Sequence, residues 1–281
     1  MSGWDVPARK VVSADGTPIA AFTTGRGPAI VLVHGATSDH TTFRVVRPLL
    51  EPRFTLHAID RRGRGASGDG ASYAVEQEFE DLAAVAEVVA ADDGAPVGVV
   101  GHSFGGRVGL GAALRTDAIA WVVCYEGAPG APGTSYKRSG IVDRLRAMLD
   151  RGDRASVLAT FMTEVVGMPA QELERFRADP VWPARVAAAH TILRELEAET
   201  SPPASLEALG AVRQPVLQIL GSLSRPVFRT ATDGLQARLA DGRVVVIDGA
   251  RHGAHHTHPL AFVAAIDAFA DEIARPRSAP S

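Results

Sequence analysis

The sequence is poor in cysteine, with Cys124 alone among 281 residues. A single cysteine cannot form a disulfide within the chain, so nothing in the composition requires an oxidising compartment. Long apolar runs are also missing. None approaches the roughly 18 residues that span a bilayer, and the first ten residues lack the apolar core of a secretory leader. The sequence therefore predicts a cytoplasmic protein with no membrane partner.

A large excess of charge of either sign is absent too. The 29 basic and 32 acidic residues give a net charge of -3, so the chain offers no electrostatic attraction to nucleic acid. Hydrophobic residues make up 46% and charged residues 22%, enough to bury a full core at this length. The composition excludes a chain that is disordered throughout and makes nucleic acid an unexpected partner. It says nothing of the oligomeric state.

Short apolar runs alternate with longer helical patterns along the chain. The runs are continuous, which is typical of strands covered on both faces in a parallel sheet; they span 29–35, 54–60, 97–103, 119–126, 215–221 and 243–249. Helical patterns cover 75–93, 104–116, 228–240 and 259–274. Asp15-Gly16 lies between two further strand-like runs and predicts an antiparallel hairpin at the sheet edge. The fold class predicted is α/β, with a mostly parallel, doubly wound sheet.

The strand signal disappears between Glu126 and Pro215. A Gly/Pro-rich loop opens this stretch, and helical patterns follow at 141–152, 154–167, 169–179 and 183–199. We expect an inserted helical cap at 127–206, and a core made of 1–126 and 207–281. The cap would lie over the carboxyl ends of the strands, where open α/β sheets bind ligands. Its large apolar side chains should mostly pack, with a few lining a pocket: Met148, Leu149, Phe161, Met162, Phe176 and Trp182.

The segment VVGHSFGG, residues 99 to 106, matches the pattern G-x-S-x-G with Gly101, Ser103 and Gly105. It directly follows a strand-like run and directly precedes a helical one. A turn this tight holds its central residue in a strained conformation, and small residues two positions away on each side prevent a clash. The pattern predicts that Ser103 is presented on a sharp elbow as a nucleophile, although a Gly-rich turn whose serine caps a helix would read the same.

Two further motifs occur at strand ends. His34-Gly35 ends the first long strand, and His252 lies in a loop between the last strand and the last helix. With the elbow, and with DRRGRGASG at 60–68, the chain resembles the α/β-hydrolase superfamily over residues 10 to 275. The resemblance implies that Ser103 is the nucleophile and His252 the general base. It also implies an oxyanion hole from the backbone N–H groups of Ala36 and Phe104, and no cofactor or metal.

Other residues of these motifs have structural interpretations. We expect His34 and His102 to hydrogen-bond loop backbone, and the charges around Asp60 and Arg62 to pin a loop. The histidines after Asp248 could suggest a metal site, but no cysteine or carboxylate set accompanies them, so we expect none; they are His252, His255, His256 and His258.

The acid that should accompany the histidine is missing from its usual place. In most members of the superfamily it follows the strand that corresponds here to 215–220, where this chain has Ser222, Leu223, Ser224 and Arg225. Glu126 ends the preceding strand, and a subset of the superfamily has its acid there. Asp233 and Asp248 are the alternatives. Glu126 is the preferred acid, although a salt bridge to Arg225 would also account for it.

These residues predict a serine hydrolase that cleaves an ester, lactone or thioester of a small hydrophobic substrate through an acyl-enzyme. No arginine cluster for phosphate or coenzyme A is evident. Three alternatives stay open: a carbon-carbon bond hydrolase, a cofactor-free haloperoxidase-like enzyme, and a non-catalytic binder of a small ligand on the same fold.

Overall fold

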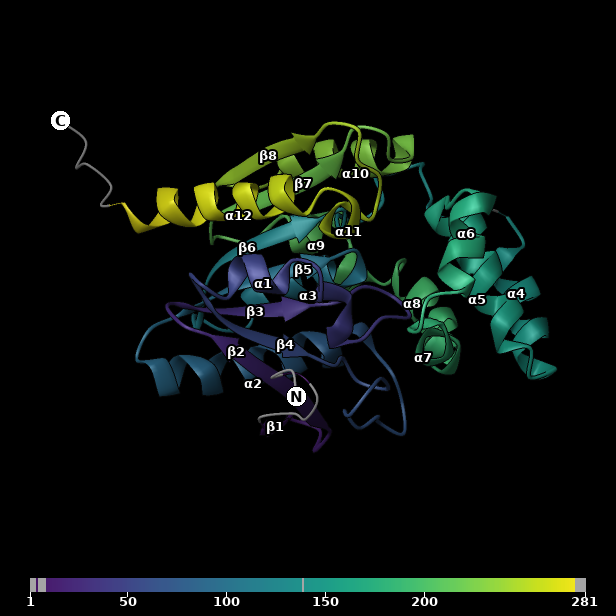
Figure 1. The fold of residues 1–281 in the computed structure, drawn as a ribbon, viewed down its shortest axis with the longest axis horizontal. Helices are drawn as coiled ribbons and strands as arrows, with labels where there is room; N and C mark the ends of the chain where they lie inside the picture. The colour runs from purple at the N-terminus through teal and green to yellow at the C-terminus, as the bar shows by residue number, and fades with distance from the viewer. Residues whose placement is uncertain (1–3, 5–8, 138, 276–281) are drawn as a thin grey trace.

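The computed structural model describes Trp4, residues 9–137 and residues 139–275 (Figure 1). Eight strands form one sheet in the order β1-β2-β4-β3-β5-β6-β7-β8. Their bounds are β1 Arg9–Val12, β2 Pro18–Gly25, β3 Ala29–Val33, β4 Thr55–Ile59, β5 Val97–His102, β6 Ile119–Tyr125, β7 Val216–Gly221 and β8 Gly242–Ile247. β1 and β2 form an antiparallel hairpin, β2 pairs antiparallel with β4, and all other pairs are parallel. The predicted fold class and edge hairpin are confirmed.

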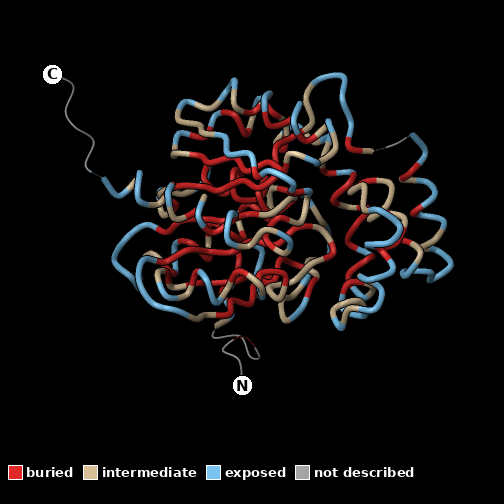
Figure 2. Tube along the Cα trace, turned by 45° about the horizontal axis from the view of Figure 1, so that its top comes forward, coloured by how far each residue is buried: buried red, intermediate tan, exposed pale blue. Residues whose placement is uncertain are grey.

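Helices cover both faces of the sheet, because successive strand side chains point to opposite sides. On one side, Val31 and Val33 pack with the residues of α2 (Val75–Asp93), α3 (Phe104–Ala113) and α10 (Pro226–Gln236). On the other, Ile30 and Leu32 pack with α1 (Arg47–Leu50) and α12 (Pro259–Ala274). Figure 2 shows the buried residues concentrated in the strands between these layers. Continuous apolar runs thus correctly indicated a sheet whose two faces are both covered by helices.

Two of the predicted strands stop just before a residue with a positive φ. The runs 97–103 and 119–126 stop at His102 and Tyr125. The next residues, Ser103 and Glu126, have φ of 55° and 47°, a region that residues other than glycine rarely adopt. A positive φ cannot continue a strand, and strained backbone of this kind is concentrated at functional sites.

The stretch between β6 and β7 is helical, as predicted. Figure 1 shows α4 to α8 beyond the carboxyl ends of the central strands. The elements are α4 Ile141–Asp150, α5 Arg154–Thr160, η2 Phe161–Val166, α6 Ala170–Arg177, α7 Trp182–Ala187, η3 Ala188–Thr191, α8 Ile192–Ala198, η4 Pro202–Ala204 and α9 Leu206–Leu209. The pattern at 154–167 predicted one helix, but its second half, η2, is a π-helical turn. The pattern at 183–199 is divided by the 3-10 turn η3.

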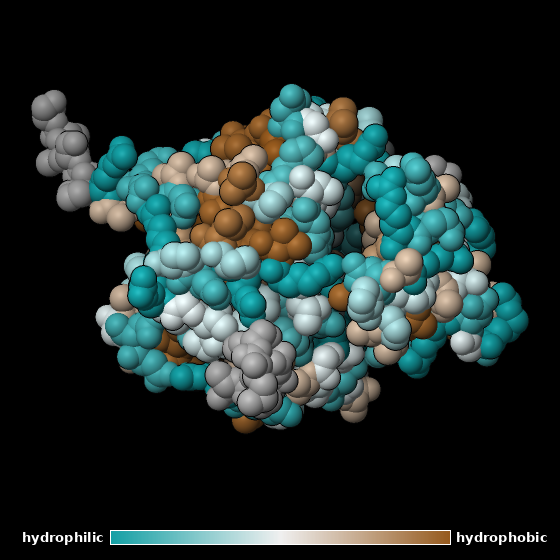
Figure 3. All heavy atoms as spheres, in the orientation of Figure 1, coloured by the Kyte–Doolittle hydropathy of each residue, from teal (hydrophilic) through white to brown (hydrophobic). Residues whose placement is uncertain are grey.

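One edge of the sheet carries exposed apolar side chains. Val244, Val245 and Val246 of β8 are exposed, as is Leu260 of α12. Figure 3 shows apolar surface over these two elements. A search of the described part of the chain found no helix both long and apolar enough to cross a membrane. Two short elements complete the fold: η1 (His40–Phe43) and α11 (Ala254–Thr257).

Candidate active site

Ser103 lies on the predicted elbow between β5 and α3. A Cβ on Gly101 would collide with the backbone of Gly105, and a Cβ on Gly105 would collide with the carbonyl groups of Val33 and His34. The two glycines therefore permit the tight turn and the close approach of the β3 end. The backbone N–H of Ser103 donates to the carbonyl of Tyr125 at 2.7 Å, which fixes the elbow against β6.

Glu126 and His252 lie beside this elbow and contact each other. His252 Nδ1 is 2.6 Å from Glu126 Oε2. The other carboxylate oxygen, Oε1, accepts hydrogen bonds from the backbone N–H of Gly221 at 2.8 Å and from the hydroxyl of Ser224 at 2.5 Å. The carboxylate is buried, so these three donors replace the water it lacks. When Nδ1–H donates to Glu126, Nε2 of the neutral ring is left with a free lone pair.

The loop that carries His252 is held by several contacts. Tyr125 accepts a hydrogen bond from the N–H of Ala254 at 2.8 Å and donates its hydroxyl to the carbonyl of Arg251. His102 Nε2 is 2.8 Å from the carbonyl of His252, and the ring of Phe228 stacks on the His252 ring with centroids 4.6 Å apart. Burial, together with the nearby His252, lowers the pKa of His102 well below its usual value, so this ring stays neutral. The loop backbone role predicted for His102 is confirmed.

The loop after β3 passes directly against the elbow. A Cβ on Gly35 would lie 3.0 Å from the Cβ of Ser103. Ala36 and Phe104 both line the same pocket as Ser103. Phe104 is the first residue of α3, and an α-helix leaves its first N–H groups without a partner inside the helix. His34 bonds loop backbone as predicted: Nδ1 is 2.8 Å from Gly35 O, and Nε2 accepts from Arg61 N at 3.0 Å.

The other carboxylates considered lie elsewhere. Asp233 is an exposed residue of α10. Asp248 is also exposed, and Ser222 donates its hydroxyl to it at 3.1 Å. Arg225 donates to the carbonyl of Tyr136 at 3.3 Å and to that of Val165. Among the three candidate acids, Glu126 is the one that the structure brings to His252.

The histidine-rich stretch divides between a loop and α11. His255 is buried, and burial with the neighbouring histidines lowers its pKa well below the usual value. Burial, with Arg44 and Arg185, lowers the pKa of His256 to about 4. Over the described residues, no group of three or more histidine, cysteine or acidic side chains is arranged to hold a metal ion.

The loop at 60–68 is pinned by its charges, as expected. Asp60 accepts from the backbone N–H of Ala66 at 2.8 Å and of His40 at 2.9 Å. Arg62 is buried and forms two hydrogen bonds of 2.7 Å to Asp81.

A second ion-pair network joins this loop to α8. Arg61 forms hydrogen bonds of 2.6 and 2.7 Å to Glu78 and one of 2.5 Å to Glu195. Arg64 also donates to Glu195. All four side chains are buried. These contacts tie the helical segment to the core beside the pocket.

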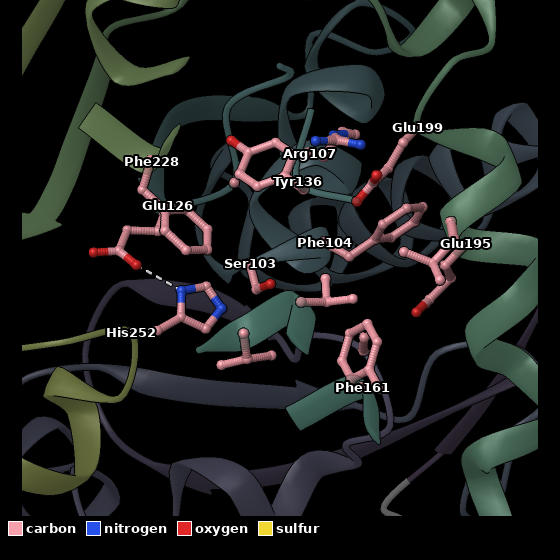
Figure 4. Close-up of a pocket in the computed structure, with 15 residues that line it drawn as sticks. Ser103, Phe104, Arg107, Glu126, Tyr136, Phe161, Glu195, Glu199, Phe228 and His252 are labelled. Carbon is pink, nitrogen blue, oxygen red and sulfur yellow. Dashed lines mark hydrogen bonds and ion pairs between the residues drawn. The ribbon is translucent and has the colours of Figure 1, made fainter. Parts of the chain in front are cut away.

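The pocket in front of Ser103 has an empty volume of about 480 Å³, part of it open to solvent. Figure 4 shows its lining, in which the core contributes Ser103, Glu126 and His252. The π-helical turn η2 contributes Phe161, Val165 and Val166, so one of the apolar residues considered from the sequence lines the pocket. The others pack against the hydrophobic cluster that extends from the sheet into the stretch between β6 and β7; they are Met148, Leu149, Met162, Phe176 and Trp182.

Sequence reasoning missed most of the polar lining: Arg107, Tyr136, Glu195 and Glu199. Arg107 lies in the first turns of α3, directly after the elbow, and this closeness in sequence was a usable signal. The other three lie in the helical segment, whose position over the pocket depends on tertiary packing.

Comparison with known proteins agrees with this geometry. The model of a protein family described as "Alpha/beta hydrolase family" matches residues 30–266 of this chain. A 2-(acetamidomethylene)succinate hydrolase of Mesorhizobium japonicum is 28% identical over 88% of this chain and 89% of its own length. A pimeloyl-[acyl-carrier protein] methyl ester esterase of Nitrosomonas europaea is 30% identical over 88% of this chain and 97% of its own.

A solved structure is also similar. The alpha/beta hydrolase from Sphaerobacter thermophilus superposes with a TM-score of 0.75 and 31% identity, over 91% of this chain and all of that one. The family match covers well over half of the sequence. The chain therefore belongs to the alpha/beta hydrolase family and is a hydrolase built on that fold.

Proposed function

We propose that the protein hydrolyses a carboxylic ester, or a related lactone or thioester, of a small substrate through an acyl-enzyme. The observation that carries this proposal is the 2.6 Å contact between Glu126 and His252 in the pocket that Ser103 also lines. The similarity to a protein named as a methyl ester esterase supports the ester bond as the target. The largely apolar lining from η2 supports a substrate with a hydrophobic part.

The reaction follows from the proposed roles. Ser103 Oγ attacks the ester carbonyl carbon while His252 Nε2 takes the hydroxyl proton, and the N–H groups of Ala36 and Phe104 stabilise the oxyanion. The C–O bond to the alcohol breaks, and His252 gives its proton to the leaving oxygen. Water then attacks the acyl-enzyme, His252 takes the water proton, and Ser103 leaves with that proton. The products are a carboxylic acid and an alcohol.

Glu126 stabilises the imidazolium that forms in each half-reaction and holds the ring in the correct tautomer. Among the described contacts no hydrogen bond joins Ser103 Oγ to His252. Catalytic hydrogen bonds of this kind often tighten only when substrate binds. The proposal thus includes a small approach of the serine hydroxyl to Nε2 in the substrate complex.

We also propose that residues 127–206 act as a cap over a core made of 1–126 and 207–281. In support, the pocket is lined by Ser103 and His252 from one part and by Phe161 and Leu196 from the other. A cap in this position would exclude water and select the substrate.

Labelling with a fluorophosphonate probe tests the proposal. We expect the wild type to be labelled and to turn over short-chain esters, and we expect Ser103→Ala to do neither while melting at the same temperature. Absence of labelling and of turnover over an ester, lactone and thioester panel would overturn the proposal and favour a non-catalytic binder. Labelling with turnover of a dicarbonyl substrate alone would point to carbon-carbon bond hydrolysis.

A further inference from the structure

Arg107 is a buried arginine in the pocket that the reaction proposed above does not use. Its side chain is 4% exposed, and it lines the same pocket as Ser103. Its backbone N–H donates to the carbonyl of Ser103 at 3.4 Å, so it lies one helical turn after the elbow. A group bound by Arg107 would therefore lie in the same pocket as the ester that Ser103 attacks.

The Arg107 side chain is held in place, but two of its nitrogens have no hydrogen-bond acceptor among the described residues. Its Nη2 donates to the carbonyl of Ala128 at 3.2 Å, and the hydroxyl of Tyr136 donates to the same carbonyl at 2.7 Å. The guanidinium carbon lies 5.6 Å from the centroid of the Phe104 ring and 6.0 Å from that of Tyr136. Within the described residues, Nε and Nη1 have no hydrogen-bond partner, although both are buried. An arginine remains protonated at any physiological pH, so Arg107 brings a buried positive charge with two unpaired N–H donors to the pocket lining.

The carboxylates nearby form no hydrogen bond with Arg107 among the described contacts. Figure 4 shows Glu199 and Arg107 at the end of the pocket away from His252. No ion pair joins these two residues among the described contacts; burial raises the pKa of Glu199, and the nearby charges of Arg107 and Lys137 oppose that shift. Glu195 directs its Oε1 to Arg61 and Arg64. Nε and Nη1 of Arg107 therefore remain without an acceptor among the described residues.

From this arrangement we infer that Arg107 binds a free carboxylate of the substrate, a few bonds from the scissile ester. This inference rests on the proposed ester hydrolysis and names its substrate class, the half-esters of short dicarboxylic acids and the esters of short hydroxy acids. The planar guanidinium presents adjacent N–H groups, a geometry that matches the two oxygens of a carboxylate. The apolar lining, which includes Phe161, Val165 and Leu196, suits the short carbon chain between the two groups.

The test compares three end groups on the same ester. The methyl half-esters of succinate, glutarate and adipate are measured against their carboxamide and ammonium analogues of equal length. A second series places the end group on the alcohol side, as acetate esters of short hydroxy acids. For the best length in one series, we expect the carboxylate to exceed the carboxamide in kcat/KM by about 10- to 100-fold. The ammonium analogue should be the poorest.

Substitutions then assign the preference to one side chain. In Arg107→Gln the carboxylate-to-carboxamide ratio should fall to near one, and Arg107→Lys should keep part of it, because the charge remains without the fork. Arg115→Gln is the control: Arg115 is exposed, bonds the carbonyl of Gly111 and leaves the ratio unchanged. Melting curves establish that each variant is folded. If Arg107→Gln does not fold, Arg107→Lys provides the test: a carboxylate-to-carboxamide ratio below that of the wild type supports the role of Arg107, and an unchanged ratio contradicts it.

The outcomes separate the two proposals. If Ser103 is labelled and neutral esters are cleaved, but the wild-type ratio is near one in both series, the role of Arg107 is wrong and the ester hydrolase stands. A preference for the ammonium analogue, or a ratio that survives in Arg107→Gln, also overturns it. If no ester is cleaved and Ser103 is not labelled, the proposed function fails and this inference fails with it.

Discussion

Ser224 donates its hydroxyl proton to Oε1 of Glu126 at 2.5 Å, from a position 98 residues further along the chain. Ser224 belongs to the loop after β7, the place where most members of the superfamily carry their acid. Here that loop holds no carboxylate and instead stabilises one that lies at the end of β6. Gly221, at the end of β7, contributes its backbone N–H to the same oxygen at 2.8 Å. In the proposed function the acid thus lies after β6, and the loop after β7 supplies hydrogen-bond donors to it.

Ser224→Ala should lower the free energy of unfolding by about 1–3 kcal/mol, because a buried carboxylate loses one of its donors. Urea denaturation measures this change. The control is Ser222→Ala, because the Ser222 hydroxyl donates to the exposed Asp248 and accepts from the backbone N–H of Gly249, both at exposed positions. For a surface substitution of this kind we expect less than about 0.5 kcal/mol. Equal losses in both variants would contradict the structural role of Ser224.

Glu126→Gln should reduce kcat by about 10³- to 10⁴-fold with folding intact, because the amide no longer stabilises the imidazolium or selects the correct tautomer of His252. Steady-state kinetics on a reactive ester measures the loss. Asp233→Asn and Asp248→Asn are matched controls, since both carboxylates are exposed, and each should retain wild-type activity. Loss of turnover in either of them, with activity kept in Glu126→Gln, would show that the acid is assigned to the wrong residue.

Glu195→Gln should lower the free energy of unfolding by about 3–5 kcal/mol, because it removes the negative charge from between two buried arginines, Arg61 and Arg64. Glu197 lies on the same helix and pairs with Arg146, with both side chains more than half exposed. Glu197→Gln should therefore cost no more than about 1 kcal/mol. Chemical denaturation of both variants makes the comparison, and similar costs would mean that the buried network does not hold α8 to the core.

Acidification should destabilise the protein between pH 6.5 and 4. Burial lowers the pKa of His34, His102 and His255 well below 6.5, and that of His256 to about 4. Below pH 6.5 the unfolded chain binds protons at these residues while the folded protein does not. The free energy of unfolding therefore decreases as the pH decreases, by up to about 1.4 kcal/mol per pH unit for each histidine.

Urea denaturation at several pH values between 7 and 4.5 measures this slope. His256→Gln should make it shallower by the contribution of about one proton, since this residue no longer titrates in the unfolded chain. An unchanged slope in His256→Gln, or a wild-type stability that does not vary over this range, would contradict the prediction.

The sequence predicted the elements that depend on local patterns. Apolar runs gave the strands to within two residues, because a strand covered on both faces requires continuous apolar side chains. The elbow was predictable since Gly101 and Gly105 are dictated by steric contacts within the turn and with the end of β3. The pairing of Glu126 with His252 was predicted as a hypothesis from strand order.

Other features could not be predicted, because they depend on where the helical segment packs. Tyr136 and Glu199 reach the pocket from a part of the chain with no strand to fix its position. The π-helical turn η2 reads as ordinary helix in sequence, and its distinct geometry appears only in the fold. Ser224 was identified as a residue that cannot carry charge. Its hydrogen bond to Glu126 could not be predicted without the contact between the two loops.

The position of Glu126 also changes how the site is assembled along the chain. Ser103 and Glu126 both belong to one continuous β-α-β unit, made of β5, α3 and β6, whose two strands are neighbours in the sheet. Of the three residues proposed to act together, His252 alone comes from beyond the helical segment. Two fragments of the protein divided within that segment would each be inactive, one holding the nucleophile with its acid and the other the base. Recovered turnover would then be a direct measure of the two halves joining between β6 and β7.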